Sequence, residues 1–154
     1  MIARTLAIGA LLVGFAARPG TADAATCSIT SVSPVAFGSY DVFDPSPRDS
    51  TGGITFQCTG VVGGDTVRID LDDGAATGFA PRTLISGAFA LAYNLYLDAA
   101  HTSVWGDGTG GSTSYGPVQP AEGSTTITIY GRVPAGQGVP AGAYGDNLLV
   151  TLHY

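Results

Sequence analysis

The last nine residues, Asp146-Asn-Leu-Leu-Val-Thr-Leu-His-Tyr154, decide how the rest of the sequence is interpreted. Every second residue is large and apolar, namely Leu148, Val150, Leu152 and Tyr154. This alternation predicts a β-strand with one buried face. The sequence then ends without a turn or a returning strand. Because an unpaired strand edge exposes its N–H and C=O groups, we expect another segment to pair with it.

The N-terminus has the features of a secretory signal peptide over residues 1–24. Arg4 supplies a positive charge, Leu6 to Phe15 form an apolar run, and Ala22-Asp23-Ala24 is a small-x-small cleavage site. The apolar run is too short to span a bilayer, and no second candidate follows it. We therefore expect an exported chain with no transmembrane anchor, whose single domain covers residues 25–154.

The charge of the exported part excludes two classes of partner. Without the signal peptide the chain has four Arg and eleven acidic residues, a net charge near −7, and it contains no Lys. Nucleic-acid binding requires basic side chains that replace the counterions on phosphate, and these are lacking. Attraction to an anionic membrane surface is equally unfavourable.

Two cysteines, Cys27 and Cys58, remain in the exported chain. An even number of cysteines in an oxidising compartment predicts a disulfide. The bond would close a loop of about 31 residues and stabilise the fold by roughly 3–4 kcal/mol. The alternative, a pair of free or metal-binding thiols, is not favoured because C-x₂-C spacing and a nearby His are both missing.

Short apolar–polar alternations between Gly- and Pro-rich turns predict an all-β sandwich. Six main strands are expected, together with a short pairing near Arg82. The main strands are expected at residues 27–35, 53–58, 66–71, 89–97, 124–133 and 147–154. An immunoglobulin-type sandwich of this size has seven strands, so the sequence is one strand short.

Eight short motifs, in order along the chain, resemble one known family. They are Cys27, Phe37-Gly-Ser-Tyr-Asp, Gly53 to Cys58-Thr, Arg82, Tyr93-Asn-Leu-Tyr-Leu-Asp-Ala, Val104-Trp-Gly-Asp-Gly, Tyr130-Gly-Arg-Val-Pro and the stretch from Ala141-Gly to Tyr154. Each motif is weak alone, but together they cover nearly the whole exported chain. The sequence resembles the spore coat protein U domain family, which includes subunits of archaic (Csu-type) chaperone–usher pili.

This resemblance implies an incomplete immunoglobulin-like β-sandwich whose last strand is missing. It also implies three partners: a periplasmic pilus chaperone that lends a strand, an outer-membrane usher, and a neighbouring pilus subunit that donates the permanent strand. Such donor-strand complementation is a form of β-augmentation. The implied acceptor groove lies between the first and last strands. Its candidate lining residues are Ile29, Leu148, Val150, Leu152 and Tyr154.

The N-terminal side of Cys27 departs from the family pattern. Fibre-forming subunits carry a donor segment there, whereas only Ala25 and Thr26 precede Cys27 after the predicted cleavage, a reach of roughly 7 Å. Cleavage after Ala17 would add no large apolar side chain. We therefore expect a subunit that accepts a strand and does not donate one, at a fibre tip or in a coat. The alternative is a self-complete secreted coat or adhesive domain.

Enzyme motifs are incomplete throughout the sequence. Gly106-Asp-Gly-Thr-Gly-Gly111 matches G-x-G-x-x-G, but no helical pattern follows to bind phosphate. Asp70-x-Asp-Asp-Gly lacks the glycine and the glutamate that a calcium loop requires. Neither histidine belongs to a recognisable triad, and a nucleophile elbow is missing. We expect a non-enzymatic protein without a cofactor or a metal.

Three apolar loop residues are candidates for contact with another surface. Val61 and Val62 lie in a predicted turn, and exposed apolar loop tips serve in adhesion. Trp105 lies in a long Gly-rich loop. For each residue the alternative is packing against the sandwich, and for Trp105 we favour packing.

Overall fold

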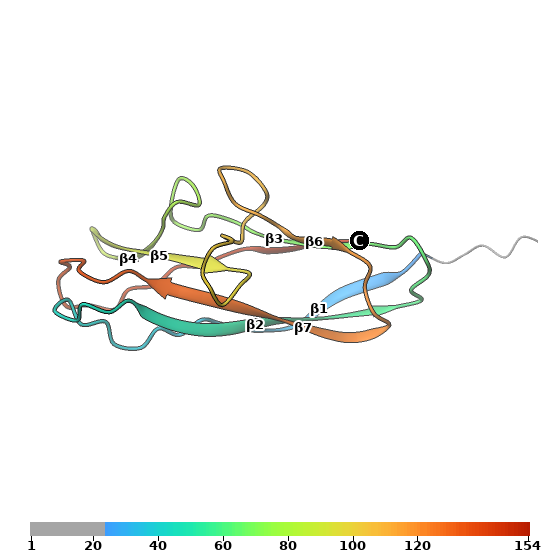
Figure 1. The fold of residues 1–154 in the computed structure, drawn as a ribbon, viewed down its shortest axis with the longest axis horizontal. Helices are drawn as coiled ribbons and strands as arrows, with labels where there is room; N and C mark the ends of the chain where they lie inside the picture. Colours follow the sequence, from blue (N-terminus) through green and yellow to red (C-terminus); the bar gives the residue numbers. More distant parts are fainter. Residues whose placement is uncertain (1–23) are drawn as a thin grey trace, which may run out of the picture.

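A computed structural model of the chain describes residues 24–154, so that all but the last residue of the predicted signal peptide lies outside the described part (Figure 1). The described residues form eight strands. These are β1 (Thr26–Ser33), β2 (Arg48–Thr59), β3 (Val67–Leu71), β4 (Arg82–Ser86), β5 (Phe89–Tyr96), β6 (Tyr115–Val118), β7 (Gly123–Val133) and β8 (Val150–His153). The prediction of an all-β fold is confirmed.

The strands form two sheets that face each other across one apolar core (Figure 1). The larger sheet has the strand order β1-β2-β7-β5-β4, and the smaller has the order β6-β3-β8. All pairings between these strands are antiparallel. This is the two-layer arrangement in which the alternate apolar faces of both sheets bury each other.

Three strands differ from the sequence-based expectation. β2 begins at Arg48, five residues before the predicted start at Gly53. Gly52 and Gly53 break the apolar alternation, but they still pair with Ile129 and Thr128 of β7. β6 lies between the strands expected at 89–97 and 124–133, where no strand was predicted, and it pairs with β3 through an irregular register. β8 has only four residues, fewer than the predicted strand over 147–154.

The core is built from alternate residues of the long central strands. Its largest contributors from β2, β3 and β7 are Ile54, Phe56, Cys58, Val67, Ile69, Leu71, Ile127, Ile129 and Val133. The predicted disulfide between Cys27 and Cys58 is present and links β1 to β2, where these two residues are also register partners. The bond therefore secures the edge strand β1 to the central strand β2.

Arg82 is fully buried between the two sheets and joins three segments. Its guanidinium donates hydrogen bonds to the carbonyl oxygens of Asp72 and Trp105, at 2.8 Å and 2.6 Å, and to Asn94 Oδ1 at 2.9 Å. Burial lowers the pKa of Arg82 from its usual value. Its acceptors are neutral, so this arginine satisfies backbone carbonyls that would otherwise be buried without a donor.

Candidate strand-acceptor groove

β1 and β8 are edge strands that lie close to each other at one side of the sandwich. β1 pairs only with β2, and β8 pairs only with β3, within the described residues. No registered pairing joins β1 to β8 in that part of the chain. The two sheets are therefore open toward each other along this side, between the predicted first and last strands.

The core-facing side chains of β1 become more exposed along the strand. Cys27 is 4% exposed, Ile29 is half-buried, and Val32 is 48% exposed. Val32 is the register partner of Ile54, so the two side chains lie on the same face of the sheet, yet Ile54 is 0% exposed. The opposite layer therefore covers Ile54 and leaves Val32 open.

The apolar side chains of β8 are covered on one side only. Val150 and Leu152 pair with Leu71 and Ile69 of β3 and pack against the core, but both stay half-buried. Leu148 is also half-buried, and Tyr154 is exposed. The structure thus places Leu148, Val150, Leu152 and Tyr154 on one edge and Ile29 on the other, and their role in a strand-acceptor groove stays a prediction.

A pocket of about 820 Å³ lies between the segment that follows β1 and the segment that precedes β8. One wall is the segment 35–42, which follows β1, and the other is formed by residues between 139 and 146, which precede β8. Leu84, Leu91 and Val133 also line it. Its aromatic lining residues are Phe37, Tyr40 and Tyr144. The pocket is therefore bounded by the two segments that extend β1 and β8 at this end of the sandwich, and Asp41 and Asp146 also line it.

The wall formed by the segment 35–42 packs closely against Gly52 of β2 and Gly131 of β7. A Cβ on Gly131 would lie 2.6 Å from Val35 Cγ1 and 2.8 Å from Phe37 Cζ, and one on Gly52 would lie 2.9 Å from Val35 Cγ2. β2 side chains hold the backbone of this wall: Ser50 Oγ donates to Ala36 O at 2.7 Å, and Arg48 Nε donates to Phe37 O at 2.8 Å. Val35 and Phe37 can therefore lie this close to the sheet only because the residues under them are glycines.

Carboxylates hold the second wall and the approach to β8. Asp146 accepts hydrogen bonds from Tyr93 Oη at 2.7 Å and from the amide of Ala75 at 2.9 Å. Burial, together with the hydrogen bond to Asp146, raises the pKa of Tyr93 far above its usual value. Asp72 Oδ1 accepts the amide of Leu149 at 2.9 Å. Asp72 N also donates to Leu149 O at 3.1 Å, so residue 149 is held to the end of β3 although the regular strand β8 begins only at Val150.

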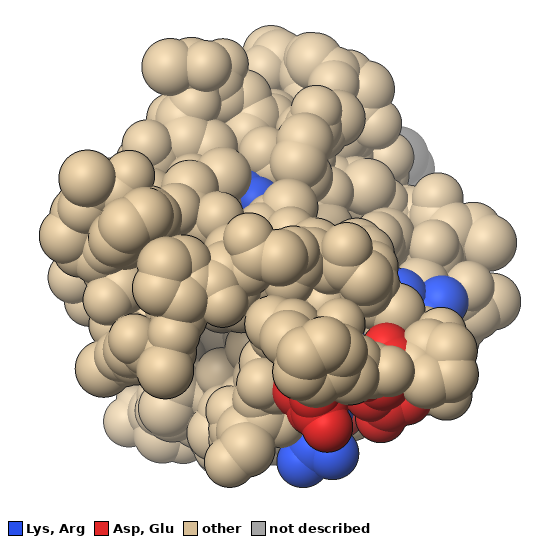
Figure 2. Space-filling model, turned by 90° about the vertical axis from the view of Figure 1, so that its left-hand side faces the viewer, with Lys and Arg blue, Asp and Glu red and all other residues tan. Residues whose placement is uncertain are grey.

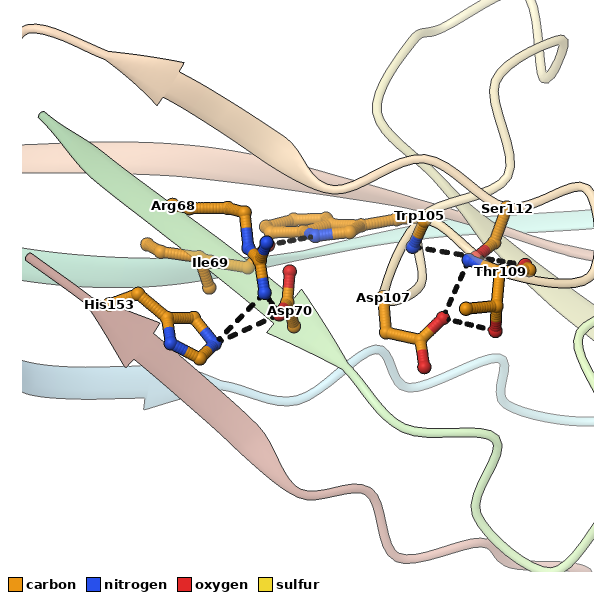
Figure 3. A network of polar contacts seen from close by, with 9 residues as sticks. Arg68, Ile69, Asp70, Trp105, Asp107, Thr109, Ser112 and His153 are labelled. Atoms are coloured by element: carbon orange, nitrogen blue, oxygen red, sulfur yellow. Dashed lines mark hydrogen bonds and ion pairs between the residues drawn. The ribbon is translucent and has the colours of Figure 1, made fainter.

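On the outer face of the small sheet, polar side chains fasten β8 to β3 (Figure 3). Asp70 Oδ2 lies 2.9 Å from His153 Nε2 and 2.7 Å from Arg68 Nη2. Figure 3 shows His153 and Arg68 both directed toward Asp70. β8 is therefore fixed at its β3 edge, and its other edge has no registered partner among the described residues.

The three candidates for surface contact have different positions. Trp105 is fully buried, and its Nε1 donates a hydrogen bond to Ile69 O at 2.9 Å (Figure 3). Trp105 as an adhesive residue is therefore wrong, because the indole packs inside the sandwich. Val62 is exposed in the turn between β2 and β3, and Val61 is half-buried against the core. The adhesive role of the two valines stays a prediction.

Sequence reasoning missed Val32 as a groove residue. A bulge between Ile29 and Ser31 shifts the register of β1, which turns Val32 to the core side. The uninterrupted alternation from Ile29 assigns that side to Ser31 and Ser33 instead. The aromatic pocket residues Phe37 and Tyr144 were noticed only as parts of motifs, since nothing local shows that they share one pocket.

Two other findings concern residues 24–154 only. Within this range no group of three His, Cys, Asp or Glu side chains is arranged to hold a metal ion. The same residues contain no helix with the length and apolarity needed to cross a membrane.

The fold and the open edge define an all-β sandwich of the immunoglobulin-like type found in chaperone–usher pilus subunits. The sequence profile of the Spore Coat Protein U domain matches residues 14–151, and the chain belongs to this family. Protein U of Myxococcus xanthus is 29% identical over 145 residues, which cover 83% of this chain and 77% of Protein U.

A solved structure has a similar fold. It is a chain from the CsuC–CsuE chaperone–tip adhesion subunit pre-assembly complex of the archaic chaperone-usher Csu pili of Acinetobacter baumannii. The TM-score is 0.56 and the sequence identity is 19%, with 84% of this chain covered. This chain spans 40% of the length of that chain, and the likeness concerns the fold.

Proposed function

We propose that this protein is a non-enzymatic, exported structural subunit of a surface pilus or coat that accepts a β-strand from another polypeptide. The strand would lie between β1 and β8 and hydrogen-bond to their free edges. Main-chain hydrogen bonds would supply affinity, and the groove side chains would set the register of the donated strand. Family membership and the fold support the structural role.

The observation that carries the proposal is the difference between Val32 and Ile54. These register partners face the same core, yet only Ile54 is covered. A strand inserted between β1 and β8 would cover Val32 together with Ile29, Val150 and Leu152. The partners proposed to supply such a strand are a periplasmic chaperone during export and then a neighbouring subunit, with an outer-membrane usher exchanging the two.

Supplying a donor strand tests the proposal directly. We expect the thermal transition of the exported domain to become more cooperative and to rise in temperature when a donor peptide or a chaperone binds, because binding to the folded state alone stabilises it. Circular dichroism during heating measures this. An unchanged transition with every chaperone and subunit peptide encoded beside this protein would contradict the proposal.

The substitution Val150→Asp tests the location of the groove. A carboxylate at this half-buried position would have to be desolvated against the inserted strand, so chaperone capture should be lost while export of the precursor continues. Ser28→Asp is the matched control, because Ser28 lies exposed on the opposite face of β1. Co-purification of the chaperone with Val150→Asp at the level of the control would show that the groove lies elsewhere.

An acceptor-only role at a fibre tip is the finer part of the proposal. Ala25 is buried, and with Ala24 it lines a small pocket beside Tyr154 on its own domain, which supports this role. N-terminal sequencing of the exported protein tests it. A mature N-terminus well before Cys27, with alternating large apolar residues, would contradict the tip role and leave strand acceptance intact.

A further inference from the structure

The hydrogen-bond ladder between β3 and β8 ends in the middle of a residue pair. The last register pair joins Leu71 to Val150. At the next position Asp72 N donates to Leu149 O at 3.1 Å, as in a regular antiparallel ladder. The return bond is different, because Leu149 N donates to the carboxylate oxygen Asp72 Oδ1 at 2.9 Å. The side chain of Asp72 therefore takes the place of its own backbone carbonyl.

Arg82 occupies the backbone carbonyl that Leu149 would otherwise use. Its Nε and Nη2 donate to Asp72 O at 3.0 Å and 2.8 Å, which engages both lone pairs of this oxygen. Arg82 is the first residue of β4, in the other sheet, and it is 0% exposed. A buried residue of the large sheet thus removes one acceptor from the ladder, and the Asp72 carboxylate supplies another.

The buried charge of Arg82 also favours a carboxylate at position 72. Burial lowers the pKa of Arg82, and the nearby carboxylates, of which Asp72 has the largest effect, oppose that shift. Figure 2 views the molecule from the end at which β4 lies in Figure 1, and the acidic side chains visible on that face gather at its lower right. Most of this face shows no charged side chain, so the buried guanidinium depends on the carboxylates inside the sandwich.

The bonds of Leu149 determine which backbone groups of β8 are left free. In an antiparallel pair, successive residues of a strand direct their N–H and C=O groups to opposite edges. Because both groups of Leu149 point to β3, those of Val150 and Leu152 point to the other edge, which has no registered partner among the described residues. The side chains of the same two residues pack against the core. A shift of one residue would reverse both arrangements.

β8 is too short to hold this register through its own pairing alone. It has four residues, and carboxylates of the β3 segment fasten both of its ends. Asp70 Oδ2 lies 2.9 Å from His153 Nε2 at the last residue of β8, and Asp72 binds Leu149 directly before its first residue. The register of the open edge therefore depends on side chains as well as on the backbone ladder.

We propose that Asp72 positions the β8 edge for an incoming strand, by holding Leu149 to β3 so that Val150 and Leu152 offer their free N–H and C=O groups to the donor. This inference rests on the proposed strand acceptance and names the residue that sets its register. Asp72 would not touch the donor, because it acts through Leu149. It is a positioning residue for the edge at which the donor would pair.

Hydrogen exchange measured residue by residue by NMR tests where the donor pairs. The probe is a synthetic peptide of the chaperone strand that cross-links to β8 when the chaperone co-purifies with the exported chain. In the free chain, the amides of Val150 and Leu152 should exchange at least about tenfold faster than that of Leu149. Saturating peptide should slow the exchange of Val150 and Leu152 at least about tenfold and leave that of Leu149 nearly unchanged.

Two substitutions at Asp72 separate its hydrogen bond from its charge. Asp72→Asn keeps the oxygen that accepts the Leu149 amide and loses the charge, whereas Asp72→Ala loses both. For Asp72→Ala we expect Leu149 to exchange at least about tenfold faster and peptide binding to weaken about fivefold. Bound peptide should then protect Leu152 but not Val150, since only the start of β8 is released. Asp72→Asn should match the unmodified protein within about twofold in both measurements.

Asp73→Ala is the matched control. Asp73 also acts on the pKa of Arg82, but only its backbone carbonyl accepts a hydrogen bond within residues 24–154, from the amide of Ala76 at 3.2 Å. This variant should leave the peptide affinity and the exchange of Leu149 unchanged. Urea unfolding shows whether each variant is folded.

The outcomes separate the two proposals. If the peptide protects β8 in the unmodified chain and Asp72→Ala behaves in the same way, the positioning inference is overturned and strand acceptance stands. Equal losses in Asp72→Ala and Asp72→Asn would also overturn it, because they would come from the charge. Equal protection of Val150 and Leu149 in the free chain would overturn it without any substitution. If the peptide protects no amide of β8 in the unmodified chain, strand acceptance fails and the positioning inference fails with it.

Discussion

The centre and the edge of the large sheet use the same residue pattern with different results. β2 and β7 pair over eleven consecutive positions, from Arg48↔Val133 to Cys58↔Gly123, and their core-facing Ile54 and Ile127 are buried. β1 pairs with β2 over most of its length, but its core-facing Val32 is half exposed. Backbone pairing with a neighbouring strand is therefore not sufficient to bury a side chain that faces the core.

Burial in a sandwich is supplied by the opposing layer. The small sheet covers the centre of the large one, and it ends at β8, short of the outer half of β1. The exposed fraction of Val32, compared with that of its register partner Ile54, shows where the large sheet lacks an opposing layer. If this explanation holds, substitutions at the centre of the sheet should destabilise the free chain more than substitutions at its edge.

The largest expected difference is between two truncations at paired positions. Ile54→Ala should lower the free energy of unfolding by about 3–4 kcal/mol, because it leaves a cavity in the packed core. Val32→Ala should lower it by less than about 0.5 kcal/mol in the free chain, since solvent already reaches this side chain. Urea unfolding of both variants measures the contrast.

The same pair of variants sharpens the comparison once a donor strand is present. Covering Val32 should raise the effect of Val32→Ala to about 1–2 kcal/mol, whereas the effect of Ile54→Ala should stay nearly the same. Equal effects of the two substitutions in the free chain would show that the edge is already covered.

A smaller effect is expected where β7 approaches the pocket wall. The Cβ of Gly131→Ala would overlap Val35 and Phe37, so this substitution should cost about 1–3 kcal/mol and weaken binding of a donor strand. Gly53→Ala is the matched control, because its Cβ would meet its nearest atoms at 3.4 Å and 3.7 Å. Should both variants behave alike in urea unfolding and in peptide titration, the segment 35–37 does not form the wall.

The smallest effect concerns an ion pair at the centre of the sheet. Asp49 and Arg132 are register partners on β2 and β7, joined by two hydrogen bonds of 2.7 Å. The hydrogen bond from Arg132 lowers the pKa of Asp49 below its ordinary value of 3.8. The pair therefore stabilises the folded state above that value, and the stabilisation is lost as the pH falls through the lower, folded-state pKa.

Arg132→Gln should accordingly destabilise the protein near neutral pH and have little effect in acid. Because both side chains are more than a third exposed, the difference should be below about 1 kcal/mol at about pH 7 and should vanish near about pH 2. Urea unfolding across this pH range measures it. If Arg132→Gln still destabilised the protein at the lowest pH, the effect would come from packing of the aliphatic part of Arg132 and not from the ion pair.

Local sequence signals were sufficient for the strands that alternate cleanly. The core strands β3, β5 and β7 and the disulfide partners were all predicted, because period-two alternation and cysteine parity are properties of short stretches or simple counts. β6 was missed because Gly116-Pro117 has no such alternation. The predicted start of β2 was late because its glycines carry no apolar side chain.

The positions of the candidate groove residues were predictable only in part, and the groove itself stays a prediction. Alternation placed Leu148, Val150, Leu152 and Tyr154 on one face, and the family resemblance added Ile29 opposite them. Val32 was not among the predicted residues, because a one-residue bulge reverses the side on which every later side chain of an edge strand lies. Trp105 lay in a Gly-rich loop, and only the three-dimensional fold shows that it packs over Ile69.

By itself the sequence determined a disulfide-linked, all-β chain with an apolar C-terminal edge, because these features depend on composition and on neighbours within a few residues. Only the tertiary structure decided where cover is lacking and which residues surround the opening. The pocket walls, 35–42 and 139–146, are about a hundred residues apart in sequence and meet only when two sheets stack. Burial depends on that stacking, so no local pattern could have specified it.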